Sequence, residues 1–396
     1  MLIFIILLTF VAVYLLYYKN NATLEQQITS FIDMNDMKCA QIRISKNEKN
    51  MLSKNYGKEY TIWNKNVKCA PNDNTIFRIA SVSKTITAAA ILGMVSTGLF
   101  TLDTKLVDIL TDLKPYDPRV NKITIRDLLR HSGGWDTVKG ITTTPFTKDI
   151  FPPTITTLAP FDPQYDSLRF LPAITTNNII TFMMQFPLNF DPGTKYAYSN
   201  FGYNLLGRVI EEISGLSYED YIKRSILNHA NVVFIGSSDI AEKHKNEVYY
   251  YDGPQDDANY GWNYNIKYKV PSSYGSFDLK IMDSHGGWVM KINDLKIFGE
   301  RLLGWEYFNK DLLKDILEKP SYVDENAKEF YSLGMRVIIT DNDIILMHNG
   351  ALTSGTFSVL SMHINSKMVT AFVANHLPVN IGKTISDYQN IIEEIV

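Results

Sequence analysis

Apolar and polar residues alternate at both ends of the chain, which is the pattern of strands with one buried face. Near the N-terminus, residues 38–46 and 58–64 alternate around the polar, turn-rich residues 47–57, so we expect a hairpin there. Four more strands are expected near the C-terminus: residues 331–340, 344–348, 354–364 and 368–375. An amphipathic helix at residues 381–396 is expected to follow them.

Helical periodicity dominates the residues between these strands. Five helices are expected there: residues 124–130, 176–185, 203–214, 217–227 and 292–303. Strands from both termini around a helical middle predict an α/β (α+β) fold, in which one antiparallel sheet flanked by helices carries a mostly helical insertion. Residues 137–172, rich in Thr, Pro and Phe, are expected to form a long loop or lid. Residues 249–277 carry many tyrosines, which either frame a binding cleft or pack on the core.

Residues 2–18 form a nearly unbroken apolar segment that ends at Lys19. At about 1.5 Å per residue, this length is near the short limit for spanning a hydrocarbon core of ~30 Å. Because the segment lacks a basic N-terminal region and a small-residue cleavage site, a membrane anchor is favoured over a cleaved signal peptide or burial in a soluble core. The predicted domains are a single-pass anchor at residues 1–20, a linker at 21–35, and one domain at 36–396, with its α/β part at 36–100 and 330–396 and its helical insertion at 101–329.

The composition of the 396 residues adds a few limits. A hydrophobic content of 45% allows a large core, and a net charge of −3 without a basic run gives no support for a nucleic-acid partner. The two cysteines, Cys39 and Cys69, either pair in an oxidising compartment or remain buried thiols. The seven histidines are scattered and no H-E-x-x-H motif occurs, so neither a catalytic metal nor another cofactor is expected.

Candidate chemistry begins at Ser81, which precedes an apolar, alanine-rich run that ends at Gly98. The run predicts a buried helix with Ser81 at its start. Residues three apart on a helix are neighbours, so the amine of Lys84 is placed to take a proton from the Ser81 hydroxyl. Helix N–H groups at the same position would stabilise an oxyanion. Ser81 is the only serine with a lysine three positions later, although a simple helix cap has the same local pattern.

Two further motifs give Ser81 a context. Tyr198-Ser199-Asn200 precedes an expected helix, and His348-Asn349-Gly350 ends an expected strand. H-x-G also occurs at His131 and His285, but there it precedes glycine turns inside the helical insertion. In the order S-x-x-K, Y-x-N and H-x-G, the chain resembles the serine β-lactamase and penicillin-binding-protein superfamily. It is most similar to the branch that contains class C β-lactamases, D-alanyl-D-alanine carboxypeptidases and related esterases.

The resemblance implies roles for four side chains. Ser81 would be the acylated nucleophile, and Lys84 would accept its proton. Tyr198 would act as general base and then as general acid, with a phenol pKa lowered from about 10 by the nearby Lys84. Asn200 would hold the substrate amide.

The same resemblance places the third motif beside the substrate. His348, Asn349 and Gly350 would bind the substrate, and the backbone N–H groups of Ser81 and Ala351 would form the oxyanion hole. Many β-lactamases carry Lys-Thr-Gly at this motif, whereas a histidine near its reference pKa of about 6.5 is mostly neutral at pH 7. Recognition of a substrate carboxylate is therefore expected to be weaker.

The leading hypothesis is a membrane-anchored serine hydrolase that acts through a Ser81 acyl-enzyme. Its small-molecule or peptide substrate would be an amide or ester, such as a β-lactam, a D-Ala peptide, another peptide or an ester. A transpeptidase would share the first half of this mechanism. The alternative class is a non-catalytic binding or assembly protein that keeps the β-lactamase-like fold, although such a protein does not need Ser81, Lys84, Tyr198 and Asn200 in register.

Overall fold

The computed structural model describes most of the chain. Described are residues 22–62, 65–136, 175–237, 242–251, 259–260, 269–270, 272–274, 279–352 and 355–395. The lid predicted at residues 137–172 lies outside them, as does most of the tyrosine-rich stretch 249–277. The chain forms two compact units: one is residues 38–377, and the other, the terminal unit, combines residues 1–37 and 378–396.

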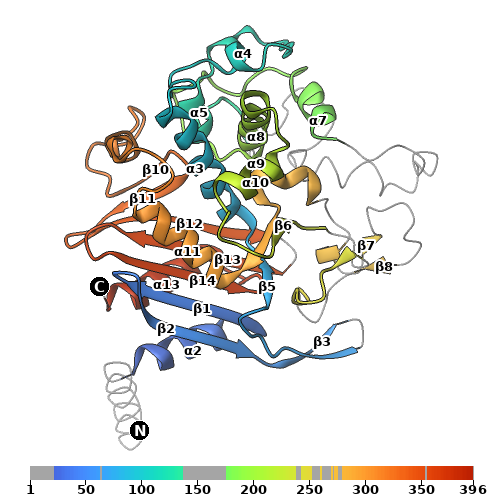
Figure 1. Ribbon diagram of the computed structural model, residues 1–396, viewed down its shortest axis with the longest axis vertical. Helices are drawn as coiled ribbons and strands as arrows, with labels where there is room; N and C mark the ends of the chain where they lie inside the picture. Colours follow the sequence, from blue (N-terminus) through green and yellow to red (C-terminus); the bar gives the residue numbers. More distant parts are fainter. Residues whose placement is uncertain are drawn as a thin grey trace, which may run out of the picture. The chain divides into compact units, whose positions relative to one another are not determined.

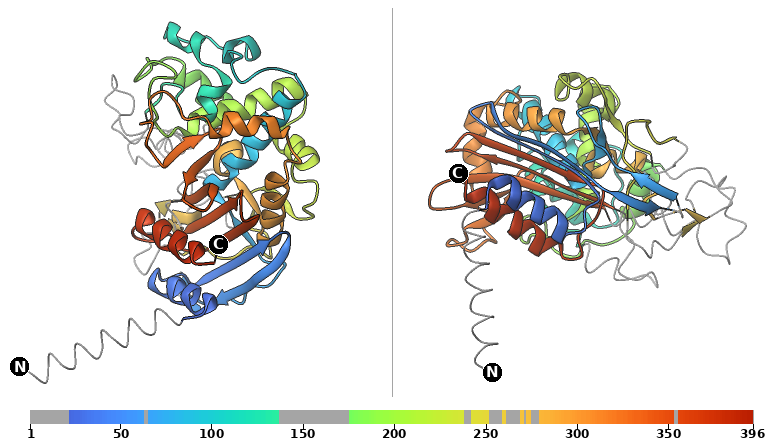
Figure 2. Two further views of the ribbon diagram at one scale, coloured as in Figure 1. Left: turned by 90° about the vertical axis from the view of Figure 1, so that its left-hand side faces the viewer. Right: turned by 90° about the horizontal axis from the view of Figure 1, so that it is seen from below.

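The terminal unit contains two described helices from opposite ends of the chain (Figure 2). Helix α2 (Leu24–Met34) starts with a capping box at Thr23 and occupies most of the segment predicted to be a linker. Helix α13 (Ile381–Glu393) confirms the predicted C-terminal helix. The two helices contact each other through Phe31 and Tyr388, whose ring centroids lie 5.8 Å apart.

A seven-stranded antiparallel sheet forms the base of the larger unit (Figure 1). In spatial order its strands are β10 (Glu329–Ser332), β11 (Met335–Ile339), β12 (Ile344–Leu352), β13 (Thr356–His363), β14 (Met368–Ala374), β1 (Cys39–Lys46) and β2 (Lys49–Gly57). β1 pairs with β14 so that Ala40 lies opposite Ala374. The antiparallel sheet built from both ends of the chain is therefore confirmed.

The prediction of an N-terminal hairpin named the wrong residues for its second strand. β1 pairs with β2, which consists of residues that were expected to form the turn. β2 lies at the edge of the sheet and is largely exposed, so its polar residues carry no apolar alternation. Part of the strand expected at residues 58–64 is the short β3 (Glu59–Ile62), which pairs with β4 (Lys65–Lys68) instead.

The single strand expected at residues 331–340 is two strands, β10 and β11, joined by a tight turn. Leu333 has a φ of +38° and Gly334 a φ of +92°, and both values are left-handed. A Cβ at position 334 would lie 2.2 Å from the Cβ of Ala88, so the close approach of this turn requires glycine. Apolar residues continue across the turn, and the sequence pattern therefore hides it.

Helices and short strands make up the rest of the larger unit. Its described helices are α3 (Ser83–Ser96), α4 (Leu106–Ile109), α5 (Ile125–Leu129), α7 (Thr176–Met183), α8 (Asn200–Ser214), α9 (Tyr218–Ser225), α10 (Asp283–Gly286), α11 (Ile292–Leu303) and α12 (Leu313–Leu317). The five helices predicted from periodicity correspond to α5, α7, α8, α9 and α11. The described short strands are β5 (Ile76–Arg78), β6 (Val233–Ile235), β7 (Asn259–Tyr260), β8 (Lys269–Val270) and β9 (Trp288–Lys291), and β5, β9 and β6 form one small sheet. α11 packs on β13, β14 and β1.

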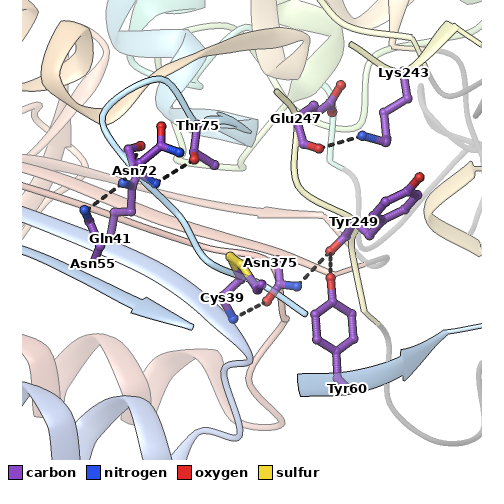
Figure 3. The surroundings of a disulfide bond; sticks show 11 residues. Cys39, Gln41, Asn55, Tyr60, Asn72, Thr75, Lys243, Glu247, Tyr249 and Asn375 are labelled. Atoms are coloured by element: carbon purple, nitrogen blue, oxygen red, sulfur yellow. Dashed lines mark hydrogen bonds between the residues drawn. A yellow bond between two sulfur atoms is a disulfide. The ribbon is translucent and has the colours of Figure 1, made fainter. Parts of the chain in front are cut away.

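A disulfide joins Cys39 at the start of β1 to Cys69, just after β4 (Figure 3). Of the two alternatives that the sequence leaves open, the structure therefore has the paired cysteines. Next to the bridge, the Cys39 N–H donates to Asn375 Oδ1 at 2.9 Å. The amide of Asn375 and the hydroxyl of Tyr60 in turn both donate to the carbonyl oxygen of Tyr249, at 2.7 and 2.8 Å. These bonds tie the bridge to the end of β14.

The predicted membrane anchor is corrected. Over the residues that the structure describes, no helix has the length and apolar character needed to cross a membrane. The longest of these helices, α8, has 15 residues, which at about 1.5 Å each is well short of a ~30 Å hydrocarbon core. Residues 2–18, on which the prediction rested, lie outside the described part.

Candidate active site

The backbone around Ser81 forms a strained turn. Ser81 lies in a 3₁₀ turn, Ala80–Val82, just before α3 rather than at the first residue of that helix. Ala80 has a φ of +46°, which is uncommon for a residue with a Cβ. The carbonyl oxygen of Ile79, one residue earlier, accepts from Ser358 Oγ on β13 at 2.7 Å. Tertiary packing thus holds the candidate nucleophile in place.

Lys84 connects the parts of the site. Its buried Nζ lies 3.1 Å from Ser81 Oγ, 2.8 Å from Asn200 Oδ1 and 2.7 Å from the carbonyl oxygen of His285. Burial lowers the pKa of the Lys84 amine well below its ordinary value of 10.5, because a charge is costly in the interior. A neutral amine has two N–H groups, which match the two carbonyl oxygens, and one lone pair, which is left for the Ser81 hydroxyl.

Tyr198 lies against the same amine, with its ring centroid 4.8 Å from Lys84 Nζ. Burial raises the pKa of the Tyr198 phenol above its ordinary value of 10, and a hydrogen bond with Ser81 offsets only part of this rise. The expected lowering of this pKa is therefore wrong, because burial penalises the phenolate more than its neighbours stabilise it. Moving a proton from Tyr198 to Lys84 would create two buried charges, so the neutral phenol and neutral amine are favoured.

The start of helix α8 places the Y-x-N motif. Ser199 caps the helix, because its Oγ accepts from the backbone N–H of Gly202 at 3.1 Å. Tyr198 precedes this cap and Asn200 follows it, and both reach Lys84. The Oδ1 atom of Asn200, expected to face the substrate amide, accepts from Lys84. The structure thus brings the first two motifs into direct contact.

His348 on β12 has partners for both ring nitrogens. Nδ1 lies 2.7 Å from the carbonyl oxygen of Asn349, and Nε2 lies 3.1 Å from the hydroxyl of Tyr331. A carbonyl oxygen only accepts, so Nδ1 carries the proton and Nε2 accepts from Tyr331. Burial is the main cause that lowers the pKa of His348 to about 3, because it penalises the charged imidazolium. The imidazole is therefore neutral in this structure at pH 7.

Gly350 brings β12 against the nucleophile turn. A Cβ at this position would lie 2.3 Å from the carbonyl oxygen of Ile79 and 3.0 Å from the Cβ of Ala80. The third motif therefore requires glycine because no side chain fits between this strand and the turn. Ala351 is the next residue of β12 and pairs with Phe357 of β13. β12, which packs against the nucleophile turn, thus contains Ala351, whose backbone N–H is expected to donate to the oxyanion.

His131 is the central residue of an aromatic cluster behind Tyr198. Its ring centroid lies 4.3 Å from that of Tyr198, 4.9 Å from that of Tyr203 and 4.6 Å from that of Tyr331. Its Nδ1 accepts from the backbone N–H of Ser199 at 3.1 Å. Burial lowers the pKa of His131 well below 6.5. The cluster is thus an uncharged wall of the site.

Three residues that contribute to this site are absent from the predicted set: His131, His285 and Tyr331. Two of them did carry a sequence signal, because His131 and His285 both begin an H-x-G pattern. Their position beside Lys84 and Tyr198 depends on contacts between distant segments, which no local pattern reveals. Tyr331 had no signal apart from its place in an expected strand.

An aromatic-walled cavity of about 300 Å³ borders the site. Its lining residues are Tyr196, Tyr322, Val323, Glu329, Phe330, Tyr331 and Arg336. Tyr331 is a wall residue that the cavity shares with the site, because its hydroxyl contacts His348 and its ring centroid lies 6.5 Å from that of Tyr198. Among the described residues, no group of three or more His, Cys, Asp or Glu side chains is arranged to hold a metal ion.

Comparison with curated proteins gives relatives that match part of the chain. The chain is 36% identical over 168 residues to the probable fimbrial assembly protein FimD, serogroup H1, of Dichelobacter nodosus, a match that covers 41% of this chain and 36% of that protein. It is 28% identical over 233 residues to protein flp of Staphylococcus aureus, which covers 58% of this chain and 41% of that protein. The chain therefore spans well under half the length of these curated relatives.

Comparison with solved structures and family models covers nearly the whole chain. The octameric penicillin-binding protein homologue from Pyrococcus abyssi matches with a TM-score of 0.64 at 22% identity, covering 90% of this chain and 74% of that one. A class C β-lactamase mutant matches with a TM-score of 0.66 at 14% identity, covering 95% and 97%. These likenesses show a β-lactamase and transpeptidase type of fold. Because the family model described as Beta-lactamase matches residues 24–386, the chain belongs to the beta-lactamase family.

Proposed function

We propose that the protein is a serine hydrolase that cleaves an amide or ester through an acyl-enzyme on Ser81. The observation that carries this proposal is the buried Lys84 amine, which lies 3.1 Å from Ser81 Oγ. Its two other neighbours are carbonyl oxygens, which hold the amine so that its lone pair is left for the serine proton. A helix cap needs no such lysine.

Acylation moves one proton around the site. Ser81 Oγ attacks the substrate carbonyl carbon while its proton passes to Lys84. The backbone N–H groups of Ser81 and Ala351 stabilise the resulting oxyanion, and loss of one such donor typically costs about 3 kcal/mol. As the intermediate collapses, the leaving group takes the phenolic proton of Tyr198, and Lys84 returns its extra proton to Tyr198. The acyl group remains on Ser81, and the site has its original protons.

Hydrolysis of the acyl-enzyme uses the same groups in reverse. A water gives a proton to Lys84, directly or through Tyr198, while its oxygen attacks the acyl carbon. Ser81 then leaves and regains a proton, which releases a carboxylic acid. A substrate amine in the place of this water would give a transpeptidase.

The H-x-G strand favours substrates that need no cation at this position. Many β-lactamases have a lysine there, whereas His348 is neutral and both of its ring nitrogens are occupied. Peptides, amides and esters of other acyl compounds are therefore proposed ahead of β-lactam antibiotics. The neighbouring aromatic cavity of about 300 Å³ is large enough to accept a side chain of such a compound.

A second candidate function is supported by the name of one relative. The FimD relative is named as a probable fimbrial assembly protein, and 36% of its length matches this chain. A role as a binding or assembly module that keeps the fold is therefore the alternative proposal. Such a module would fold normally and would not form an adduct on Ser81.

Intact-mass spectrometry separates the two candidates. The wild-type protein is incubated with a fluorophosphonate and, separately, with a labelled penicillin, alongside Ser81→Ala and the control Ser96→Ala from the far end of α3. We expect a fluorophosphonate adduct on wild type and Ser96→Ala that Ser81→Ala lacks. Absence of any adduct in folded protein would contradict the hydrolase and favour the binding module. The lifetime of a penicillin adduct distinguishes a slow penicillin-binding protein from a hydrolase.

A further inference from the structure

We propose that His131 is the positioning residue for Tyr198, which it holds through the backbone on both sides and through ring contact. The proposal rests on the proposed function, in which Tyr198 delivers the proton to the leaving group. His131 lies on the segment after α5, 67 positions before Tyr198, and only the tertiary fold brings them together. Its side chain is almost fully buried.

His131 accepts two hydrogen bonds, one from the residue before Tyr198 and one from the residue after it. The backbone N–H of Ala197 donates to the carbonyl oxygen of His131 at 2.9 Å. The backbone N–H of Ser199 donates to the Nδ1 atom of His131 at 3.1 Å. The residues immediately before and after Tyr198 are thus both hydrogen-bonded to His131. The position of the phenol therefore depends on His131 more directly than on the cap of α8.

The imidazole also supports the Tyr198 ring. The two ring centroids are 4.3 Å apart with planes inclined at 39°, which is an offset, tilted contact. The rings of Tyr203 and Tyr331 also lie against the imidazole, with centroid distances of 4.9 and 4.6 Å. Rotation of the Tyr198 side chain away from Lys84 would require this packed group to move.

The hydrogen bond from Ser199 determines which ring nitrogen of His131 carries the proton. Because Nδ1 accepts from the Ser199 N–H, a neutral imidazole carries its proton on Nε2. Protonation of Nδ1 would turn an acceptor into a donor that faces another donor, and the bond to Ser199 would break. The groups that face this imidazole are Tyr196, Tyr198, Tyr203 and Tyr331, with Lys84 and His348 nearby, and none of them is an acid that would stabilise an imidazolium.

The backbone at His131 restricts which substitutions fold. Its φ is +56°, a left-handed conformation in which Asn, Asp and His are several-fold enriched. His131→Asn suits this backbone and retains an acceptor near the position of Nδ1, but it lacks the ring. His131→Phe retains a ring and lacks the acceptor. The two variants therefore separate the two contacts.

The kinetic test is a double-mutant cycle with Tyr198→Phe. We would measure kcat and KM for a 4-nitroanilide, an amide whose leaving group must take a proton. Each His131 variant is expected to lower kcat for this amide at least tenfold with little change in KM, because the misplaced phenol no longer delivers its proton to the leaving group. In the Tyr198→Phe background the same variants should have no further effect, because His131 acts only through the phenol. The proposal would be overturned if the His131 variants lower kcat as much in the Tyr198→Phe background as in wild type, or if they do not lower kcat at all.

Two further measurements separate positioning from folding. His363→Asn removes an equally buried imidazole from β13 and should leave kcat for the amide unchanged even if it lowers the melting temperature. Hydrogen exchange of the peptide that spans residues 196–200 should accelerate in His131→Phe and less in His131→Asn. If the wild-type protein neither reacts with the fluorophosphonate nor cleaves the amide, the proposed function fails. The exchange result still decides the positioning, because equal protection of residues 196–200 in wild type and His131→Phe would overturn it.

Discussion

The amine of Lys84 lies 3.1 Å from the hydroxyl of Ser81 in a site where the amine has no exposed surface. Its other two neighbours, the Asn200 amide oxygen and the His285 carbonyl oxygen, accept its N–H groups and carry no formal charge. Burial therefore disfavours the ammonium form of Lys84 relative to that of an exposed lysine. In the proposed mechanism, an unprotonated Lys84 amine takes the Ser81 proton without prior activation.

Replacement of Lys84 should abolish most acylation while leaving the fold intact. Lys84→Met keeps a long side chain in the buried position and removes the base, so we expect fluorophosphonate labelling of Ser81 to slow by roughly 10² to 10⁴-fold. Lys296→Met, which removes a partly buried lysine of α11 that pairs with Glu300, is the control and should label at the wild-type rate. Equal labelling rates in Lys84→Met and wild type would exclude Lys84 as the base.

Substitution of Gly350 should move the nucleophile turn. In Gly350→Ala the added Cβ would meet the Ile79 carbonyl oxygen and Ser358 Oγ, each at 2.3 Å. Such overpacking typically costs about 1–3 kcal/mol, and displacement of the turn should also slow labelling. Both effects are measured by urea unfolding and by the labelling rate.

The matched control for this substitution is Gly382→Ala in α13. The nearest atom to an added Cβ there is 3.7 Å away, so no contact is disturbed. Its free energy of unfolding should stay the same or rise by up to about 1 kcal/mol, because alanine favours a helix. A Gly350→Ala protein as stable and as reactive as this control would contradict the packing of β12 on the turn.

Reduction of the disulfide should lower stability. Cys39 and Cys69 are 30 residues apart in sequence, and closing a loop of this length stabilises a fold by about 3–4 kcal/mol in the chain-entropy model. Urea unfolding with and without reductant measures the difference. In Cys39→Ser/Cys69→Ser the reductant should have no effect. A wild-type midpoint that does not change with reductant would mean that the bridge contributes nothing.

Acid should destabilise the fold through buried histidines. Burial lowers the pKa of His348 to about 3 and that of His363 to about 4, whereas unfolding restores values near 6.5. Between these values the unfolded chain binds protons that the native protein does not, so stability falls as pH decreases from about 6.5 to about 4. Each histidine contributes at most ~1.4 kcal/mol per pH unit. Urea unfolding across this range should give a shallower slope for His363→Gln than for wild type, and equal slopes would contradict this account.

Much of the fold follows from the sequence because its strands are buried. β13 and β14 are buried along their whole length, and β1 nearly so, which gives strong apolar patterns at both ends of the chain. The edge strand β2 is mostly exposed, and its polar residues resemble a turn. The turn at Gly334 is hidden because apolar residues run through it. Apolar sequence patterns thus report burial. They are misleading where a strand is exposed, as in β2, or where buried residues form a turn.

The site residues that belong to sequence motifs could be predicted. Those that reach the site only through tertiary packing could not. S-x-x-K and Y-x-N name residues that the structure brings together at Lys84, and each motif sits at the start of a helix. The protonation of the site was not predictable, because the pKa of Tyr198 depends on complete burial that motifs do not encode. His131 was missed for the same reason: its importance lies in contacts with residues far along the chain.

The most direct test of the central claim is the pH dependence of Ser81 labelling by a fluorophosphonate, with Lys84→Met as the reference for reaction without the base. If Lys84 is neutral in the resting site, the wild-type rate constant should already be at its plateau at neutral pH and stay flat to about pH 10. A rate that rises about tenfold per pH unit up to about pH 10.5 would show that Lys84 is an ordinary ammonium ion. That result would contradict the proposed mechanism.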